Sequence, residues 1–225
     1  MSGYKPDKES FVSWNEEMIR KYDPDKYHNH ESLIIRTVEK MRRRAVRKLC
    51  GEEAGEVVDI GCGAGNFIPH FDGFRYIGID ISEYILGEAA GRLRENAFLI
   101  RASAEELPLK DKSARCIICS EVIEHVLDPA ALATEAGRAL ADDGIAVFSI
   151  PNEKLINLLK RIIPWIGASK KGYSAPRRMD DEWHLTALDS RLFREIIKGK
   201  FRIEKQIGVP SAFMPLRYVF RLRKI

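Results

Sequence analysis

A glycine-rich loop and a nearby acid are the first residues whose types and spacing indicate chemistry. Gly61, Gly63 and Gly65 alternate with other residues directly after an apolar run, and Asp80 ends the next apolar run. Alternate glycines let the chain turn tightly and let a ligand approach the backbone. A carboxylate at the end of the second strand is placed to accept hydrogen bonds from ribose hydroxyls. Together these features predict a nucleoside site.

The spacing of the loop and the charge beside it narrow the choice of nucleoside. A dinucleotide site reads GxGxxG and holds a pyrophosphate, whereas this loop reads GxGxG and follows an acid, Asp59. A carboxylate beside the loop opposes a phosphate but suits an ammonium group. S-adenosylmethionine carries an ammonium group and a sulfonium charge, so the loop favours this cofactor over NAD.

A second group of residues can carry out acid–base or metal chemistry. Glu121, Glu124 and His125 follow the fourth apolar run, and His184 precedes a later helical segment. If residues 121–125 open a helix, offsets of three and four place all three on one face. Two carboxylates and two imidazoles can hold Mg²⁺ or Mn²⁺ and leave two positions for a substrate with adjacent oxygens. The alternatives are a metal-free site with His125 or His184 as the general base, and a purely structural role.

These residues need a sheet that brings the strand ends together. Short apolar runs lie at 57–60, 74–79, 97–100, 114–119, 145–150 and 201–207, and helical patterns lie between them at 82–94, 129–141 and 188–198. This alternation predicts a doubly wound α/β fold with a mostly parallel sheet. Cys116 and Cys119 fall in one run and point to opposite faces, so we interpret them as core residues and not as metal ligands. The tail from Pro215 to Ile225 fits a closing antiparallel strand and an interfacial helix equally well.

The motifs, in their order, resemble those of the class I S-adenosylmethionine-dependent methyltransferases. The matching segments are VVDIGCGAGNF, GIDIS, RASAEELP, ICSEVIEHV, GRALADDGIAVFSIPN and WHLTALDSRLFREII, within about residues 31–207. The resemblance implies a Rossmann-like fold and places cofactor contacts at Asp59, Gly61, Cys62, Gly63, Gly65, Asp80, Ile81, Ser103, Ala104 and Ser120. It assigns Asp59 to the methionine amino end, Asp80 to the ribose, and Ser103 with Ala104 to the adenine. Many relatives have an acid where this chain has Ser103.

The ExxEH…H arrangement is similar to that of ubiquinone-biosynthesis O-methyltransferases and of small-RNA 2′-O-methyltransferases. The resemblance implies catalytic roles for Glu121, His125 and His184, and a metal site that adds Glu124. The expected function is methylation of a hydroxyl on a small-molecule or lipid-linked acceptor. The alternatives are a small-RNA 3′-terminal 2′-O-methyltransferase and a non-catalytic scaffold that binds S-adenosylmethionine.

Residues 151–178 form an insert after the fifth strand. Its apolar stripe at helical spacing contains Leu155, Leu158, Leu159, Ile162, Ile163 and Ile166, and its basic border contains Lys160, Arg161, Lys170 and Lys171. Such a pattern is typical of a helix that lies on anionic lipid, so we expect residues 153–171 to contact a membrane surface. A lid over the site or a dimer contact is the alternative. The apolar character argues against nucleic acid as a partner.

Length and composition exclude some classes of protein. The 225 residues carry a net charge of +4 with 45% hydrophobic residues, which excludes a disordered acidic chain and a histone-like polycation. We expect a helical cap or lid over residues 1–50 and the cofactor-binding domain over residues 51–225. Within the cap, residues 33–49 read as an amphipathic helix on the sheet. Five aromatic or imidazole side chains form either a lid over the strand ends or part of the core: Trp14, Tyr22, Tyr27, His28 and His30.

No apolar run reaches the ~20 residues of a membrane span, and the N-terminus lacks the apolar stretch of a signal peptide. These observations favour a cytoplasmic location. If the insert binds lipid, we expect the protein to lie peripherally at the membrane.

Overall fold

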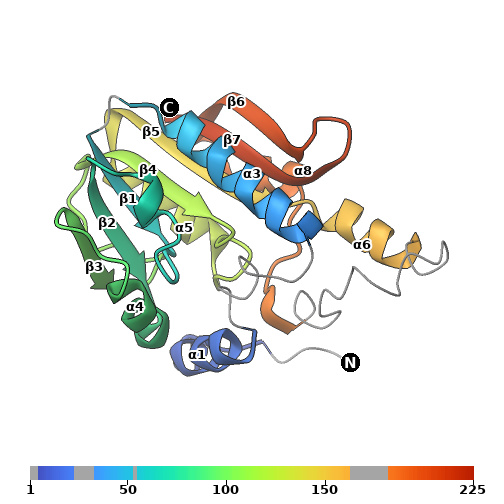
Figure 1. The fold of residues 1–225 in the computed structure, drawn as a ribbon, viewed down its shortest axis with the longest axis horizontal. Helices are drawn as coiled ribbons and strands as arrows, with labels where there is room; N and C mark the ends of the chain where they lie inside the picture. Colours follow the sequence, from blue (N-terminus) through green and yellow to red (C-terminus); the bar gives the residue numbers. More distant parts are fainter. Residues whose placement is uncertain (1–4, 23–32, 53–54, 163–181) are drawn as a thin grey trace.

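The computed structural model describes residues 5–22, 33–52, 55–162 and 182–225, and it contains a seven-stranded sheet (Figure 1). The strands are β1 (Glu56–Ile60), β2 (Arg75–Asp80), β3 (Ala97–Arg101), β4 (Ala114–Ser120), β5 (Leu140–Pro151), β6 (Phe201–Pro210) and β7 (Pro215–Lys224). Their order across the sheet is β3-β2-β1-β4-β5-β7-β6. The first five are parallel, and β7 pairs antiparallel with both β5 and β6. The predicted doubly wound fold is confirmed, and the tail is the closing antiparallel strand.

The sheet has a topological switch point between β1 and β4. From β1 the chain builds outward through β2 and β3 on one side, and through β4 and β5 on the other. Connections therefore diverge at the carboxyl ends of β1 and β4, and a crevice opens there. The residues that the sequence marked for chemistry follow these strand ends.

Helices cover both faces of the sheet. They are α1 (Phe11–Tyr22), α3 (Leu33–Cys50), α4 (Glu83–Ala90), α5 (Pro129–Ala139), α6 (Glu153–Ile162) and α8 (Ser190–Ile197), with a 3₁₀ turn at Ile68–His70. Helix α3 crosses one face of the sheet (Figure 1), while α5 and α8 pack on the opposite face. Alternation along the strands divides the core accordingly: Cys116 packs on the α3 side, and Cys119 packs on the other. None of the described helices combines the length and the apolar character that crossing a bilayer requires.

Helix α3 confirms the predicted amphipathic helix, but its first turn departs from the pattern. Val46 and Leu49 are buried against the sheet, whereas Leu33 and Ile34 are 68% and 66% exposed. The next residue, Ile35, lines the cavity described below. The first turn of α3 thus borders this cavity and does not reach the core.

Helix α1 lies across the crevice at the strand ends. Trp14 is buried in a cluster with Ile85 of α4 and Trp183, and Tyr22 stacks on Trp183 with ring centroids 6.3 Å apart. Trp14 and Tyr22 therefore pack into a small core of their own, and this core lies over the crevice. For these two residues, the lid and the core packing expected from the sequence are both present. Tyr27, His28 and His30 lie outside the described residues. The division of the chain at residue 50 stays a prediction.

Candidate active site

A cavity of about 320 Å³ lies at the switch point. Its walls come from the loops after β1, β2, β3 and β4, and from α1, α3, α6 and the segment that carries Trp183 and His184. Eight of the predicted cofactor residues line it: Gly61, Cys62, Gly63, Asp80, Ile81, Ser103, Ala104 and Ser120. One cavity therefore contains most of the predicted cofactor site.

The glycine loop owes its shape to three glycines that adopt positive φ, Gly61, Gly63 and Gly65. Gly61 has φ 67°, and a Cβ there would collide with the side chain of Val122. Gly63 has φ 52°, lines the cavity, and would carry a Cβ into open space with no atom within 4 Å. Only glycine adopts this backbone without strain, and at Gly63 it also leaves the cavity wall as bare peptide.

Asp80 joins the loop to the second strand. Its Oδ2 accepts from the backbone N–H of Gly63 at 2.9 Å, and its Oδ1 accepts from the N–H of Ser82 at 3.0 Å. Burial raises the pKa of this carboxyl, although the backbone N–H groups of Ser82 and Gly63 oppose the shift. Each carboxylate oxygen keeps a further lone pair, so Asp80 can accept hydrogen bonds from a ligand as well as hold the loop.

Two of the predicted cofactor residues do not line the cavity. Asp59 is buried on the α3 side of the sheet, where the hydroxyl of Tyr76 donates to its Oδ2. Burial raises the pKa of Asp59 to about 7, and this hydrogen bond opposes the rise. Gly65 is turned toward Ile68 and Ala89. The structure therefore places Asp59 and Gly65 outside the cavity wall.

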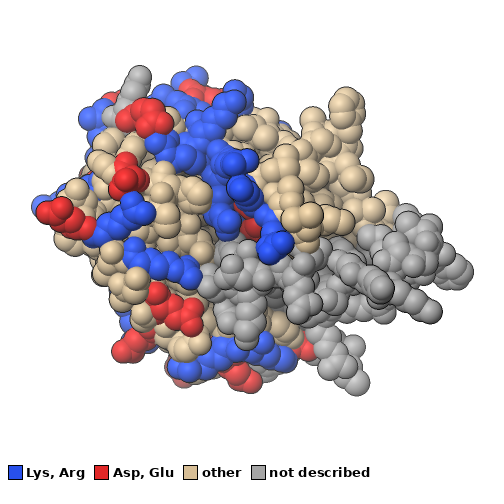
Figure 2. Space-filling view, viewed as in Figure 1, with Lys and Arg blue, Asp and Glu red and all other residues tan. Residues whose placement is uncertain are grey.

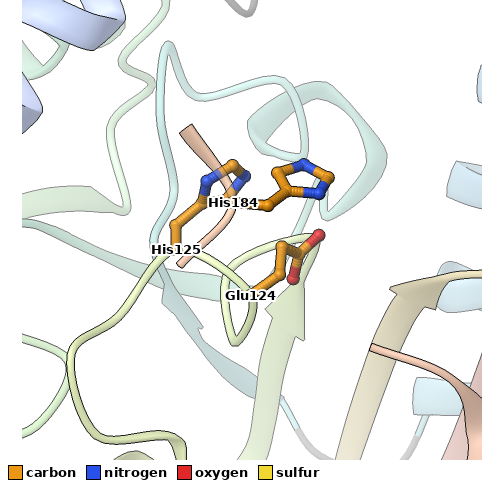
Figure 3. Close-up of side chains that lie close together, drawn as sticks. All are labelled: Glu124, His125 and His184. Atoms are coloured by element: carbon orange, nitrogen blue, oxygen red, sulfur yellow. The ribbon is translucent and has the colours of Figure 1, made fainter. Parts of the chain in front are cut away.

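Glu124, His125 and His184 form one cluster in the cavity. Their candidate ligand atoms all lie within 4.8 Å of one another, and the side chains converge from the loop after β4 and from the segment at residue 184 (Figure 3). Burial raises the pKa of Glu124 to about 8, helped by the charge of Glu121. Burial, with a smaller contribution from His184, lowers the pKa of His125 to about 3, so its imidazole is neutral at pH 7.

Glu121 stands apart from this cluster. Residues 121–125 form turns and not a helix, and Glu121 has φ 58°. Its Oε1 accepts from Ser149 Oγ at 2.9 Å, and its Oε2 lies 2.5 Å from Arg217 Nε. The conditional expectation of one helical face for Glu121, Glu124 and His125 is therefore wrong, because the left-handed backbone at Glu121 sends its carboxylate toward β7.

Four charged residues in the cavity wall were not predicted from the sequence: Glu39, Arg42, Glu153 and Arg217. Arg42 is buried on α3, donates to Glu39 Oε2 through Nε at 3.0 Å, and also donates to Ser120 Oγ. Glu153 Oε1 lies 2.8 Å from His184 Nδ1. A buried Glu–Arg pair at i,i+3 within the apolar stripe of α3 was a readable signal for Arg42. No local pattern indicated Arg217 or Glu153.

The strand order and the cavity at the switch point define a Rossmann-like domain of the kind found in class I methyltransferases. Comparison with known proteins agrees: residues 58–148 match the model of the family described as methyltransferase domain, so this part of the chain is similar to that family. The resemblance of the sequence motifs to those of S-adenosylmethionine-dependent methyltransferases is confirmed.

Curated relatives act on different acceptors. The chain is 29% identical over 150 residues to the ubiquinone biosynthesis O-methyltransferase of Methylococcus capsulatus, covering 64% of this chain and 62% of that protein. It is 26% identical to the trans-aconitate 2-methyltransferase of Variovorax paradoxus, covering 64% and 52%. The matches thus span about half to six-tenths of the length of these relatives. Among solved structures, a Pyrococcus horikoshii protein shares the fold with a TM-score of 0.67 and 19% identity, over 93% of this chain and 99% of that one.

Proposed function

We propose that the protein is an S-adenosylmethionine-dependent methyltransferase that methylates an oxygen on a small-molecule or lipid-linked acceptor. The observation that carries the proposal is one cavity in which Asp80 and the bare peptide at Gly63 adjoin Glu124, His125 and His184. The first pair suits a nucleoside, and the second group suits the removal of a proton from an acceptor. Two relatives, from Methylococcus capsulatus and Marinomonas sp., are named O-methyltransferases, which supports oxygen as the methylated atom.

The cofactor end of the cavity fits S-adenosylmethionine. Asp80 would accept hydrogen bonds from the ribose hydroxyls, Ser103 and Ala104 would hold the adenine, and the loop from Gly61 to Gly63 would hold the amino-acid arm; all of these residues line the cavity. Arg42 would hold the carboxylate of that arm, because a buried guanidinium in the wall is a matched partner for a carboxylate. When bound there, the cofactor supplies a methyl group on a positively charged sulfur.

The acceptor end of the cavity combines an apolar wall with a cluster of polar side chains. Ile35, Val38, Ile156, Leu159 and Leu216 line the cavity beside Glu124 and the two histidines. An acceptor with an apolar body would pack on the wall and place its hydroxyl at the polar cluster. An imidazole of this cluster can take the hydroxyl proton as the oxygen attacks, which is general-base chemistry.

We also propose that Glu124, His125 and His184 can hold a divalent ion such as Mg²⁺ or Mn²⁺. Glu124 Oε2 is buried and makes no hydrogen bond within the described part of the chain, so it offers a free ligand oxygen. Glu121, the fourth ligand expected from the sequence, is engaged by Arg217 and Ser149 instead. An ion at this place would lower the pKa of a bound acceptor hydroxyl.

The membrane contact expected for residues 153–171 remains a proposal, and residues 163–171 lie outside the described part of the chain. Helix α6 supports it, since Leu158 is 51% exposed while Ile156 and Leu159 of the same helix face the cavity. Figure 2 shows Lys and Arg side chains along the outer face of α3, where Arg36, Lys40, Arg44 and Lys48 are exposed. Apolar and basic groups together suit an anionic lipid surface.

The test is turnover of the purified protein with S-adenosylmethionine against catechols, polyprenyl phenols and 3′-terminal RNA, each with and without a chelator. Methylation of a phenolic acceptor supports the proposal, and methylation of RNA alone would replace it with the RNA alternative. Tight cofactor binding in calorimetry without transfer to any class would favour the scaffold. His184→Ala should abolish stimulation by divalent ion and leave cofactor affinity intact; equal stimulation of wild type and variant would remove His184 as a ligand.

A further inference from the structure

His184 is held by a carboxylate from a different element. Its Nδ1 lies 2.8 Å from Glu153 Oε1, and the two side chains are only 9% and 12% exposed. Glu153 is the first residue of α6. Asn152, just before it, accepts from the N–H of Leu155 through Oδ1 and donates from Nδ2 to the carbonyl of Pro215 at 2.8 Å. Helix α6 is therefore anchored to the start of β7 at the residue beside Glu153.

The contact decides which nitrogen of His184 carries the proton. A carboxylate accepts hydrogen bonds, so the Nδ1 that faces Glu153 carries the N–H, and in the neutral ring the lone pair is then on Nε2. The ring is further confined by His125, whose centroid lies 4.8 Å away at an interplanar angle of 80°. His125 in turn packs on Trp183 with centroids 4.6 Å apart. The imidazole is thus fixed both in tautomer and in orientation.

We propose that Glu153 is a positioning residue that holds His184 in the Nδ1–H tautomer, so that Nε2 is presented to the acceptor hydroxyl in the cavity. The role of Nε2 rests on the proposed function, but the tautomer does not. Glu153 is useful in the same way whether Nε2 takes a proton or holds an ion, because a carboxylate on the second ring nitrogen orients the ring and raises its basicity.

The placement of Glu153 also connects His184 to the apolar wall of the cavity. Ile156 and Leu159 follow Glu153 at offsets of three and six, and all three residues line the cavity. An acceptor that packs on Ile156 and Leu159 therefore steadies the helix turn that orients His184. Acceptors without an apolar body lose this contact, so the arrangement selects for acceptors with one, and the selection acts on kcat as well as on KM.

The first measurement uses no turnover. Long-range ¹H–¹⁵N NMR of the wild-type protein distinguishes the histidine tautomers, and His184→Asn assigns the signal among the five histidines. The proposal expects the Nδ1–H form in the wild type and in Glu153→Gln, whose amide oxygen still accepts, and loss of this form in Glu153→Ala. An Nε2–H form in the wild type, or no change in Glu153→Ala, would overturn it. This result does not depend on methyl transfer, so failure of the proposed function would appear separately as an inactive wild type.

The second measurement is kinetic. Glu153→Ala should lower kcat by about 10–100-fold, the usual effect of removing a group that orients a functional histidine. Affinity for S-adenosylmethionine in calorimetry should not change. Glu153→Gln should recover most of the rate. The matched control is Glu195→Ala, an exposed glutamate on α8 that is paired with Lys198. A loss of rate in Glu153→Ala that Glu153→Gln shares in full would show that the negative charge, and not the tautomer, is what matters.

Discussion

The carboxylate of Asp80 accepts a hydrogen bond from the backbone N–H of Gly63 at 2.9 Å. The acid that ends β2 and the glycine loop that follows β1 are therefore one unit, although 17 residues separate them in the chain. The unit places a carboxylate and bare peptide side by side in the cavity wall, and the cofactor proposal depends on this juxtaposition.

Asp80→Ala should weaken binding of S-adenosylmethionine more than tenfold. Hydrogen bonds to a charged group contribute about 1.5–3 kcal/mol, and the variant also frees the loop at Gly63. Isothermal calorimetry measures the effect. Asp72→Ala is the control, because Asp72 is exposed and paired with Arg94 outside the cavity wall. Unchanged affinity in Asp80→Ala would remove Asp80 from the site.

A comparison of two glycines separates backbone strain from ligand contact. Gly63 and Gly73 both have positive φ, 52° and 81°, and neither would place a Cβ within 4 Å of another atom. Alanine at either position should destabilise the protein by about 1–2 kcal/mol through the left-handed backbone. Only Gly63→Ala should also weaken cofactor binding, because Gly73 does not line the cavity. Equal affinities in the two variants would contradict the placement of the cofactor at the loop.

Arg42 can be tested apart from its role in folding. Arg42→Met leaves Glu39 buried without its partner and should cost about 3–5 kcal/mol of stability, whereas Glu39→Leu with Arg42→Met removes both charges and should restore much of it. Both variants should bind S-adenosylmethionine more weakly, because both lack the guanidinium. Chemical denaturation and calorimetry give the two quantities. Wild-type affinity in the stable double variant would show that Arg42 serves the fold alone.

Asp59 should make the protein less stable as pH rises. Burial raises its pKa from 3.8 to about 7, so between these values the folded protein keeps a proton that the unfolded chain has lost. The free energy of unfolding attributable to Asp59 is therefore highest near pH 4, falls as pH approaches 7, and levels off above it. Subtracting the curve of Asp59→Asn from that of the wild type isolates this contribution. A flat difference for Asp59→Asn would contradict the raised pKa.

Leu158 provides a test of the membrane surface. Leu158→Glu places a charge on the exposed face of α6 and should abolish co-sedimentation with vesicles that contain anionic lipid. Leu192→Glu on α8 is a matched control, since Leu192 is also exposed, at 39%, but on a helix packed on the opposite face of the sheet from α3. Equal vesicle binding by both variants and the wild type would exclude α6 as the contact.

The local sequence predicted the features that depend on backbone periodicity and on glycine. Apolar runs of strand length, helical stripes and the GxGxG loop each follow from residues close together in the chain, and the structure confirms their arrangement in a doubly wound sheet. The cofactor contact expected at Asp59 went against this periodicity, because a period of two places Asp59 with Val57 on the α3 side of the sheet, outside the cavity wall.

Only the tertiary structure determined which partners the charged side chains contact. Glu121 was grouped with Glu124 from their spacing, but a left-handed backbone turns it to Arg217, which lies 96 residues further along the chain. Glu153 meets His184 across 31 residues, and no motif links them. Burial then gives Glu124 and His125 pKa values that neither residue type has in water. Long-range packing sets the distances between these side chains and removes water from around them. Local sequence patterns therefore determined the strands, helices and glycine loop, whereas the folded chain determined the contacts and pKa values of the charged groups in the site.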